Sequence, residues 1–135
     1  MSFGSPLAGL AVLLASTALA FAEDCPAKST QMDDVIAALN EAPSCDRAMK
    51  VFEACEYGAS GDVQFGAVVE KKCEDDFLKR LKAPRKLSYQ REKRVCDRKY
   101  ANQSGTMYVS FAAFCRAEVA QRYSQQALKV GTAAR

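Results

Sequence analysis

The sequence predicts a small all-α domain of about five helices that is held together by disulfides. Apolar residues recur at intervals of three and four along most of the chain, which is the spacing of one face of a helix. No segment alternates apolar and polar residues as a half-buried strand would, and no Asn-Gly or Asp-Gly pair marks a hairpin. The chain of 135 residues contains six cysteines. An even number of cysteines is typical of a disulfide framework in a small secreted protein.

The N-terminal segment predicts export. The uncharged apolar run LAGLAVLLASTALAFA ends in the small-x-small pattern of Ala20, Phe21 and Ala22, which is typical of a signal peptide over residues 1–22 that is cleaved after Ala22. A spanning helix and a lipid anchor are the alternatives, but the run is shorter than the roughly 20 apolar residues that a span needs. No lipid-attachment pattern precedes the first cysteine. We therefore expect residues 23–135 to form a single helical disulfide-bonded domain, periplasmic or secreted, with no transmembrane segment after cleavage.

Two short helices are predicted in the first half of this domain, over residues 29–42 and 44–57. Ser29 or Thr30 would cap the first and Ser44 the second, because hydroxyl side chains accept hydrogen bonds from the free N–H groups of a first turn. The residues expected on the two buried faces are Met32, Val35, Leu39, Ala42, Ala48, Val51, Phe52 and Cys55.

Three longer helices are predicted in the second half. They cover residues 62–81, a basic segment that begins near Pro84 and includes SYQREKRVCDRKY (residues 88–100), and residues 107–129. We expect the last helix to fray at Gly131. The residues expected on the three buried faces are Phe65, Val68, Val69, Cys73, Phe77, Leu81, Tyr89, Cys96, Tyr100, Tyr108, Phe111, Ala112, Cys115 and Val119.

The helix pattern also favours particular disulfides. A helical hairpin that turns at residues 58–61 would place Cys45 beside Cys73, because the two cysteines lie at similar distances from the turn. The turn NQSG would bring Cys96 toward Cys115. About five residues separate Cys96 from this turn and about nine separate the turn from Cys115, so the two helical segments differ in length by roughly 6 Å. The predicted pairs are therefore Cys45–Cys73, Cys96–Cys115 and, from the two cysteines that remain, Cys25–Cys55.

Charge is distributed unevenly along the chain. Residues 23–76 contain 13 acidic and 5 basic residues, whereas residues 79–99 contain 10 basic and 2 acidic residues. The net charge of +3 for the whole chain conceals this segregation. One interpretation is structural, since the acidic helices could attract the basic helix within the fold or the charges could simply solvate the surface. The other is that the basic segment binds an anionic partner.

Three arginines are the candidate binding residues. On a helix, Arg91, Arg94 and Arg98 fall on the side opposite Tyr89 and Cys96. The cysteine is then expected to face the core, while the arginines face water as a basic surface. Such a surface suits a phosphate, a membrane surface or an acidic protein. We do not expect nucleic acid as a partner, because no nucleic-acid-binding motif accompanies the charge.

The residue types present argue against an enzyme. The chain has no His, which removes the usual general base of hydrolases and the commonest zinc ligand. It has no Cys-x-x-Cys motif of a thiol oxidoreductase. The neighbouring acids Asp33 and Asp34, and those of residues 74–76, would point in different directions on a helix and are expected to be solvated. We therefore expect no catalytic residues, no cofactor and no metal site.

The segment LKAPRKLSYQREKRVCDRKYANQSGTMYVSFAAFCRAEVAQRY (residues 81–123) resembles the N-terminal domain of the LprI-type lysozyme-inhibitor family. The matching positions are Tyr89, Arg91-Glu92, Cys96, Gly105-Thr106, Cys115 and Arg122. The match is partial: it covers roughly the last 55 residues, and the chain has no Trp, a residue usual in the family. The resemblance implies a helical disulfide-bonded envelope protein that binds a protein partner such as a lysozyme without catalysis, and it supports the pairing of Cys96 with Cys115.

Two functions are consistent with these observations. A lysozyme-inhibitor-like protein could offer its acidic helices to the basic rim of a lysozyme, or extend an arginine toward the carboxylates of the lysozyme cleft. A structural or stress-related periplasmic protein could instead use the basic helix to bind anionic envelope lipid or cell-wall polymer.

Overall fold

The computed structural model describes Met1 and residues 23–133. The predicted signal peptide and its cleavage after Ala22 lie outside the described residues. The helices are α1 (Met32–Glu41), α2 (Cys45–Cys55), α3 (Asp62–Glu74), the 3-10 helix η1 (Leu78–Arg80), α4 (Ala83–Tyr100) and α5 (Thr106–Ala133). No strand occurs among these residues, so the predicted all-α fold of about five helices is confirmed.

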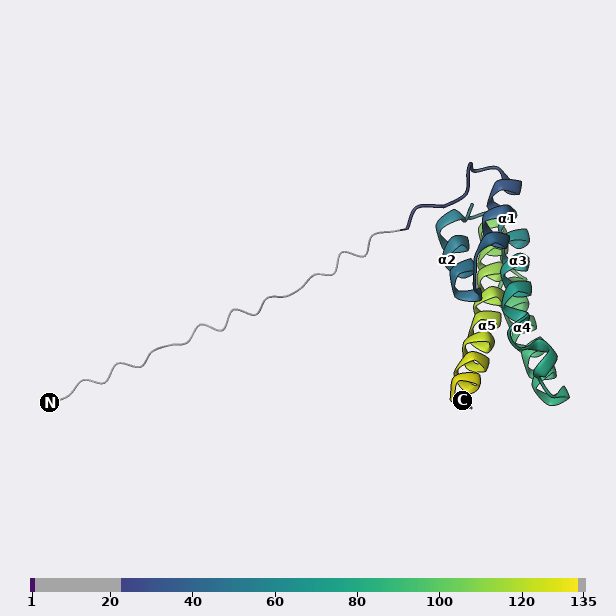
Figure 1. Cartoon of the computed structure of the whole chain (residues 1–135). Helices are drawn as coiled ribbons and strands as arrows, with labels where there is room; N and C mark the ends of the chain where they lie inside the picture. Colours follow the sequence, from purple (N-terminus) through teal and green to yellow (C-terminus); the bar gives the residue numbers. More distant parts are fainter. Residues whose placement is uncertain (2–22, 134–135) are drawn as a thin grey trace.

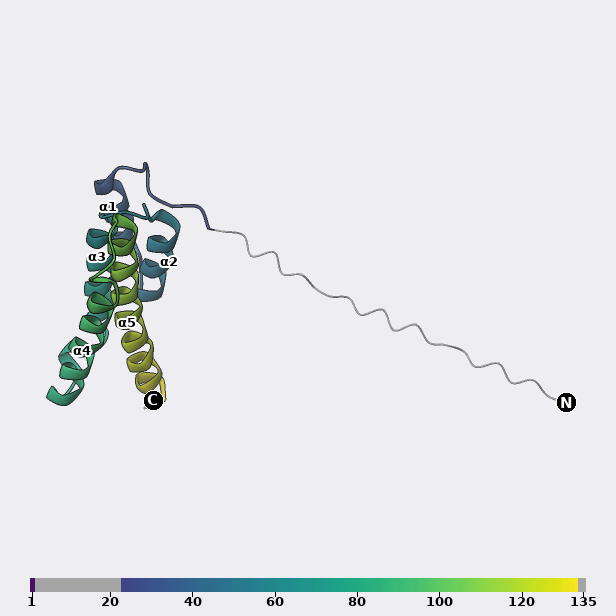
Figure 2. The same cartoon turned by 180° about the vertical axis from the view of Figure 1, so that it is seen from behind.

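α5 is the central element of the bundle. Its 28 residues extend over about 42 Å, and it packs most extensively against α3 and then against α4. α1, α2 and α3 surround its N-terminal half (Figure 1). Beyond them, the start of α4 and the end of α5 diverge at the far end of the molecule, which both views show (Figures 1 and 2).

The core lies where α2 and α3 meet α5, and α1 packs against α3 and α2. All the residues predicted to be buried in α2 are buried. The structure also buries Val35 and Leu39 of α1 and Ala42, which follows that helix. Phe52 of α2 stacks on Phe114 of α5 with the ring centroids 3.9 Å apart. These contacts bury most of the apolar surface that the short helices contribute, which is the main source of their stability.

The helix caps follow the sequence only in part. Ser44 caps α2 as predicted, since its hydroxyl accepts a 3.1 Å hydrogen bond from the N–H of Arg47. The prediction that Ser29 or Thr30 caps α1 is wrong, because Gln31 precedes the first helical residue. Ser29 instead accepts the N–H of Gln31 and donates to Asp34, so it stabilises the turn before the helix.

The turn between α2 and α3 is closed by a buried carboxylate. Asp62 accepts the N–H groups of Tyr57 and Gly58, at 2.8 and 2.9 Å, and the hydroxyl of Ser110 in α5 at 2.6 Å. Gly58 has a φ of 66°, a conformation that glycine adopts without strain. Asp62 therefore fixes the geometry of this turn against α5.

The single helix predicted over residues 62–81 is interrupted. α3 ends at Glu74, and the backbone of Phe77 leaves the helical region with a φ of −141° before η1 begins. This break turns the buried ring of Phe77 between α4 and α5, where its centroid lies 5.0 Å from that of Tyr89 and 5.5 Å from that of Tyr123. Aromatic packing explains why the apolar spacing continues although the helix does not.

The buried face of α5 differs from the predicted one. Phe111, predicted to be buried, has 41% of its surface exposed, and Ala113, Ala117 and Ala120 face the core instead. The reason is the close approach of α3, because a Cβ atom added at Gly66 would lie 3.1 Å from the carbonyl oxygen of Ala113. Only small side chains fit at this crossing. The expected fraying at Gly131 is also wrong, since α5 continues to Ala133.

Three disulfides connect the elements in the predicted pairing. Their Cα–Cα distances are 4.8, 4.6 and 5.6 Å, which lie in the usual range. Cys25–Cys55 attaches the segment before α1 to α2, Cys45–Cys73 joins α2 to α3, and Cys96–Cys115 joins α4 to α5.

Candidate functional site

The candidate site is the outer side of α4, where helical spacing predicts three exposed arginines. Arg91, Arg94 and Arg98 are all exposed, whereas Tyr89 and Cys96 of the same helix are buried. Positions i, i+3 and i+7 lie on one side of a helix and here extend over about 10 Å. We call these three residues the arginine face.

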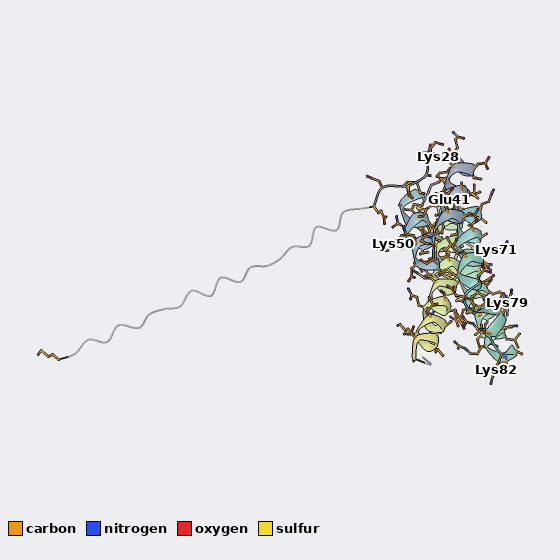
Figure 3. All side chains as sticks on the ribbon, viewed as in Figure 1. Lys28, Glu41, Lys50, Lys71, Lys79 and Lys82 are labelled. Carbon is orange, nitrogen blue, oxygen red and sulfur yellow. A yellow bond between two sulfur atoms is a disulfide. The ribbon has the colours of Figure 1, made fainter. Side chains whose placement is uncertain are left out.

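The arginine face is not neutralised within the fold. None of the ion pairs among residues 23–133 includes Arg91, Arg94 or Arg98. Lys79 and Lys82 are also exposed and lie near the start of α4 (Figure 3). The arginine face therefore presents three guanidinium groups to solvent with their hydrogen-bond donors available.

The attraction between the acidic and basic parts of the chain is concentrated on another residue of α4. The Nζ atom of Lys93 lies 3.2 Å from Oε2 of Glu70 and 3.2 Å from Oε1 of Glu74, both in α3. Only 7% of Lys93 is exposed. The structural and functional interpretations of the charge thus apply to different residues: Lys93 holds α4 to α3, and the arginines face outward.

Lys93 and its partners were not predicted as a cluster. The spacing does contain a signal, because Lys93 follows the buried Tyr89 by four residues and precedes the buried Cys96 by three. A lysine on the buried side of a helix requires a counter-charge on the neighbouring helix. Glu74, expected to be solvated, also accepts the hydroxyl of Tyr89 at 2.7 Å.

Arg116 of α5 extends this cluster. Its guanidinium donates to Glu70 at 3.0 Å and to Asp97 at 2.8 Å. Burial alone would lower the pKa of Arg116, but the hydrogen bonds and charges of Glu70 and Asp97 outweigh burial and raise it. The cluster therefore joins α3, α4 and α5 through five charged side chains.

A hollow of about 480 Å³ lies over the cluster, with Val63, Ala67 and Val109 among its apolar walls. The five charged side chains of the cluster line this hollow and are already paired with one another, and no buried side-chain nitrogen or oxygen of the described residues lacks a partner. Burial, the hydrogen bond to Glu74 and the nearby carboxylates raise the pKa of Tyr89, so this phenol stays protonated. We assign the cluster a structural role.

Two kinds of reactive site can be checked among the described residues, a free thiol and a metal-binding cluster. Every cysteine is in a disulfide, so no thiol serves as a nucleophile. Within residues 23–133, no three His, Cys, Asp or Glu side chains are grouped in a way that could hold a metal ion. None of the helices in this part of the chain combines the length and the apolar character needed to span a bilayer.

The residues that carry the family resemblance lie on the hairpin of α4 and α5. Glu92 of α4 pairs with Arg122 of α5 and accepts the hydroxyl of Tyr123 at 2.6 Å. Gly105, in the connecting loop, has a φ of 115° that favours glycine. Most of the matching positions thus stabilise the hairpin, and Arg91 is the one that belongs to the arginine face. Comparison of the chain with protein-family models, with curated proteins and with solved structures gives no match.

Proposed function

We propose that this protein is a small periplasmic or secreted binding protein without catalytic activity, and that the arginine face contacts an anionic surface of its partner. The observation that carries the proposal is the alignment of Arg91, Arg94 and Arg98 on one side of α4, exposed and without an ion-pair partner among the described residues. Guanidinium groups bind carboxylates and phosphates through paired hydrogen bonds, which makes arginine well suited to such surfaces.

The disulfide beside the arginine face supports this role. Cys96 lies between Arg94 and Arg98 and is bonded to Cys115 of α5. Lys93 fixes the same turn of α4 to α3. The helix is therefore held in place before a partner arrives, so less ordering is required on binding than a flexible basic segment would need.

The partner that we propose first is a lysozyme. The resemblance to lysozyme inhibitors suggests this class, and lysozymes carry two carboxylates in an open cleft. An arginine extended into that cleft would pair with those carboxylates and occupy the position of the substrate. The acidic part of the chain is a less direct candidate, because Asp46, Glu70 and Glu74 are already engaged by side chains of the fold.

A second candidate partner is anionic lipid or cell-wall polymer. The observation that favours it is the presence of exposed apolar side chains on the same helix as the arginine face: 63% of Leu87 and 50% of Val95 are exposed. A helix that combines arginines with aliphatic residues suits the interface of an anionic membrane.

The test is a binding titration of the oxidised protein against lysozyme and, separately, against phosphatidylglycerol vesicles. The variant replaces Arg91, Arg94 and Arg98 with Ala. The matched control replaces three exposed lysines with Ala: Lys28 before α1, Lys50 on α2 and Lys71 on α3 (Figure 3). The net charge of the control therefore falls by the same amount as that of the arginine variant. We expect the arginine variant to lose at least tenfold in affinity for one of the two partners and the control to lose much less. Equal affinities of the two variants, or no binding to either partner, would contradict the proposal.

A further inference from the structure

A groove lies between the diverging ends of α4 and α5, away from the arginine face. Its volume is about 390 Å³, and its lining is mainly apolar, with Phe77 and Tyr123 buried at the bottom and Leu81, Ala127 and Val130 on the walls. Figures 1 and 2 show the separation of the two helix ends that leaves this space.

The walls of the groove are open to solvent at the C-terminal end of α5. Val130 has 70% of its surface exposed. A second hollow of about 300 Å³ adjoins the groove and shares Arg80, Ala127 and Gly131 with it. Exposed apolar surface that lines a concave site is typical of a binding site for an apolar group.

The rim of the groove is cationic. The guanidinium of Arg85 covers the ring of Tyr123 at 4.9 Å and donates to the side-chain oxygen of Gln126. Arg80 donates to the backbone carbonyl of Asp76, whose carboxylate is occupied by the hydroxyl of Ser124. Neither arginine forms an ion pair within the described part of the chain. Both retain donors that an anion could use.

The start of α4 adds to this positive potential. No side chain caps its first turn, and that turn contains no acidic residue. The N-terminal end of a helix carries a partial positive charge, which attracts anions. Lys82, the residue directly before α4, is also exposed.

We propose that this groove binds a single-chain anionic amphiphile, with the alkyl chain against Phe77, Tyr123 and Ala127 and the anionic head at Arg80 and Arg85. The charge of the rim selects an anion, and the apolar floor selects a chain. A volume of about 390 Å³ is near the lower end of the range for small-molecule sites, roughly 300 to 1,000 Å³. This size suits one chain rather than a lipid with two.

A second copy of the protein is a poorer occupant. A symmetric pair would place the same patch of each subunit against the other. Arg80, Lys82 and Arg85 of the two copies would then repel one another across the contact. The proposed ligand avoids this repulsion because its head is anionic.

The experiment is calorimetric titration of the oxidised protein with decanoate below its micellar concentration, with 1-decanol as the uncharged chain and acetate as the anion without a chain. We expect one decanoate to bind per protein, about tenfold or more tightly than decanol, because hydrogen bonds between a guanidinium and a carboxylate are stronger than those to a neutral hydroxyl. Acetate should give no measurable heat of binding.

The first variant replaces the exposed Arg80 and Arg85 with Gln. It should weaken decanoate binding about tenfold and leave decanol binding unchanged. The control replaces Arg91 and Arg94 with Gln, and it should bind both as the parent does. Replacement of the exposed Val130 with Ser should weaken the binding of both decanoate and decanol, since it removes part of the apolar wall.

Several outcomes would overturn the proposal. The protein could bind decanoate and decanol with equal affinity, or the control variant could lose as much affinity for decanoate as the variant without Arg80 and Arg85. The protein could also associate with phosphatidylglycerol vesicles but not with monomeric decanoate, or form a concentration-dependent dimer that excludes decanoate. The result is independent of the proposed function, because the variant without Arg91, Arg94 and Arg98 should still bind decanoate.

Discussion

At the scale of single residues, the most informative position is Lys93. It contacts two glutamates of α3, and its Nζ atom lies 4.6 Å above the ring of Tyr89. Its neighbour Arg94 is exposed and has no such partner among the described residues. Adjacent residues of like charge in the sequence therefore have different roles, which net charge alone does not reveal.

Replacement of Lys93 with Ala should destabilise the protein by about 3 kcal/mol, because it leaves Glu74 without a cation and Glu70 with only one. Replacement of Arg94 with Ala should change the free energy of unfolding by less than about 0.5 kcal/mol. Urea denaturation of the two variants measures the difference. Similar midpoints would show that the buried ion pair is not required.

Tyr89 makes the free energy of unfolding decrease at alkaline pH. Its pKa is raised, first by burial and then by the hydrogen bond to Glu74, whereas in the unfolded chain the phenol loses its proton near pH 10. Above that pH the unfolded chain binds fewer protons than the folded one, so the free energy of unfolding falls as the pH rises. In the variant Tyr89→Phe this fall should be shallower between pH 9 and 11. An unchanged slope would contradict the assignment.

At the scale of elements, the crossing of α3 and α5 determines how the bundle packs. Gly66 allows α3 to approach Ala113, and the buried face of α5 consists largely of alanines and serines for the same reason. Phe111, which the periodicity placed in the core, turns outward. Its ring centroid lies 5.9 Å from that of Tyr100 and 5.8 Å from that of Tyr108.

Replacement of Gly66 with Val should cost about 1 to 3 kcal/mol, because the added side chain would displace α3 from α5. The matched control is Ala67→Val on the exposed side of the same helix, where only the lower helix propensity of valine acts, about 0.6 kcal/mol. Chemical denaturation distinguishes the two. Equal losses of stability in the two variants would mean that the close contact between Gly66 and Ala113 does not limit the packing of α3 on α5.

Helical periodicity predicted the number of helices, their approximate ranges and the inner side of α4. It failed where tertiary contacts override local spacing. The break before Phe77 depends on the ring packing with Tyr89 and Tyr123, which no local pattern contains. The orientation of α5 depends on a glycine in another helix. For the candidate site, spacing alone placed the arginines on the outer side of α4, but their lack of ion-pair partners required the fold.

At the scale of the whole molecule, the three disulfides connect elements in sequence. Each of the bonds Cys25–Cys55, Cys45–Cys73 and Cys96–Cys115 joins segments that are close along the chain, at separations of 30, 28 and 19 residues. Together they cover all the α-helices except α1, which lies between the segment of Cys25 and α2.

Replacement of both Cys96 and Cys115 with Ser should lower the free energy of unfolding by about 2 to 4 kcal/mol, because the unfolded chain regains the freedom that the bond removes. The helices should still form, since Glu92 and Arg122 also join α4 to α5. Thermal unfolding followed by circular dichroism measures the loss. An unchanged melting temperature would contradict a stabilising role for this bond.

The charge distribution of the folded molecule is the basis of the proposed function. The acids of α3 neutralise Lys93 and Arg116, so that the remaining positive charge of α4 lies outward on a helix that a disulfide holds in place. For the protein to bind through this helix as proposed, Arg91, Arg94 and Arg98 must act together as one binding surface.

The most direct test measures lysozyme activity on cell-wall substrate with a micromolar excess of the oxidised protein. The parent and the variant without Lys28, Lys50 and Lys71 should both inhibit, and the variant without the three arginines should not. Unimpaired lysozyme activity with the parent would contradict the lysozyme proposal, and equal inhibition by all three proteins would show that the arginine face is not the surface that binds.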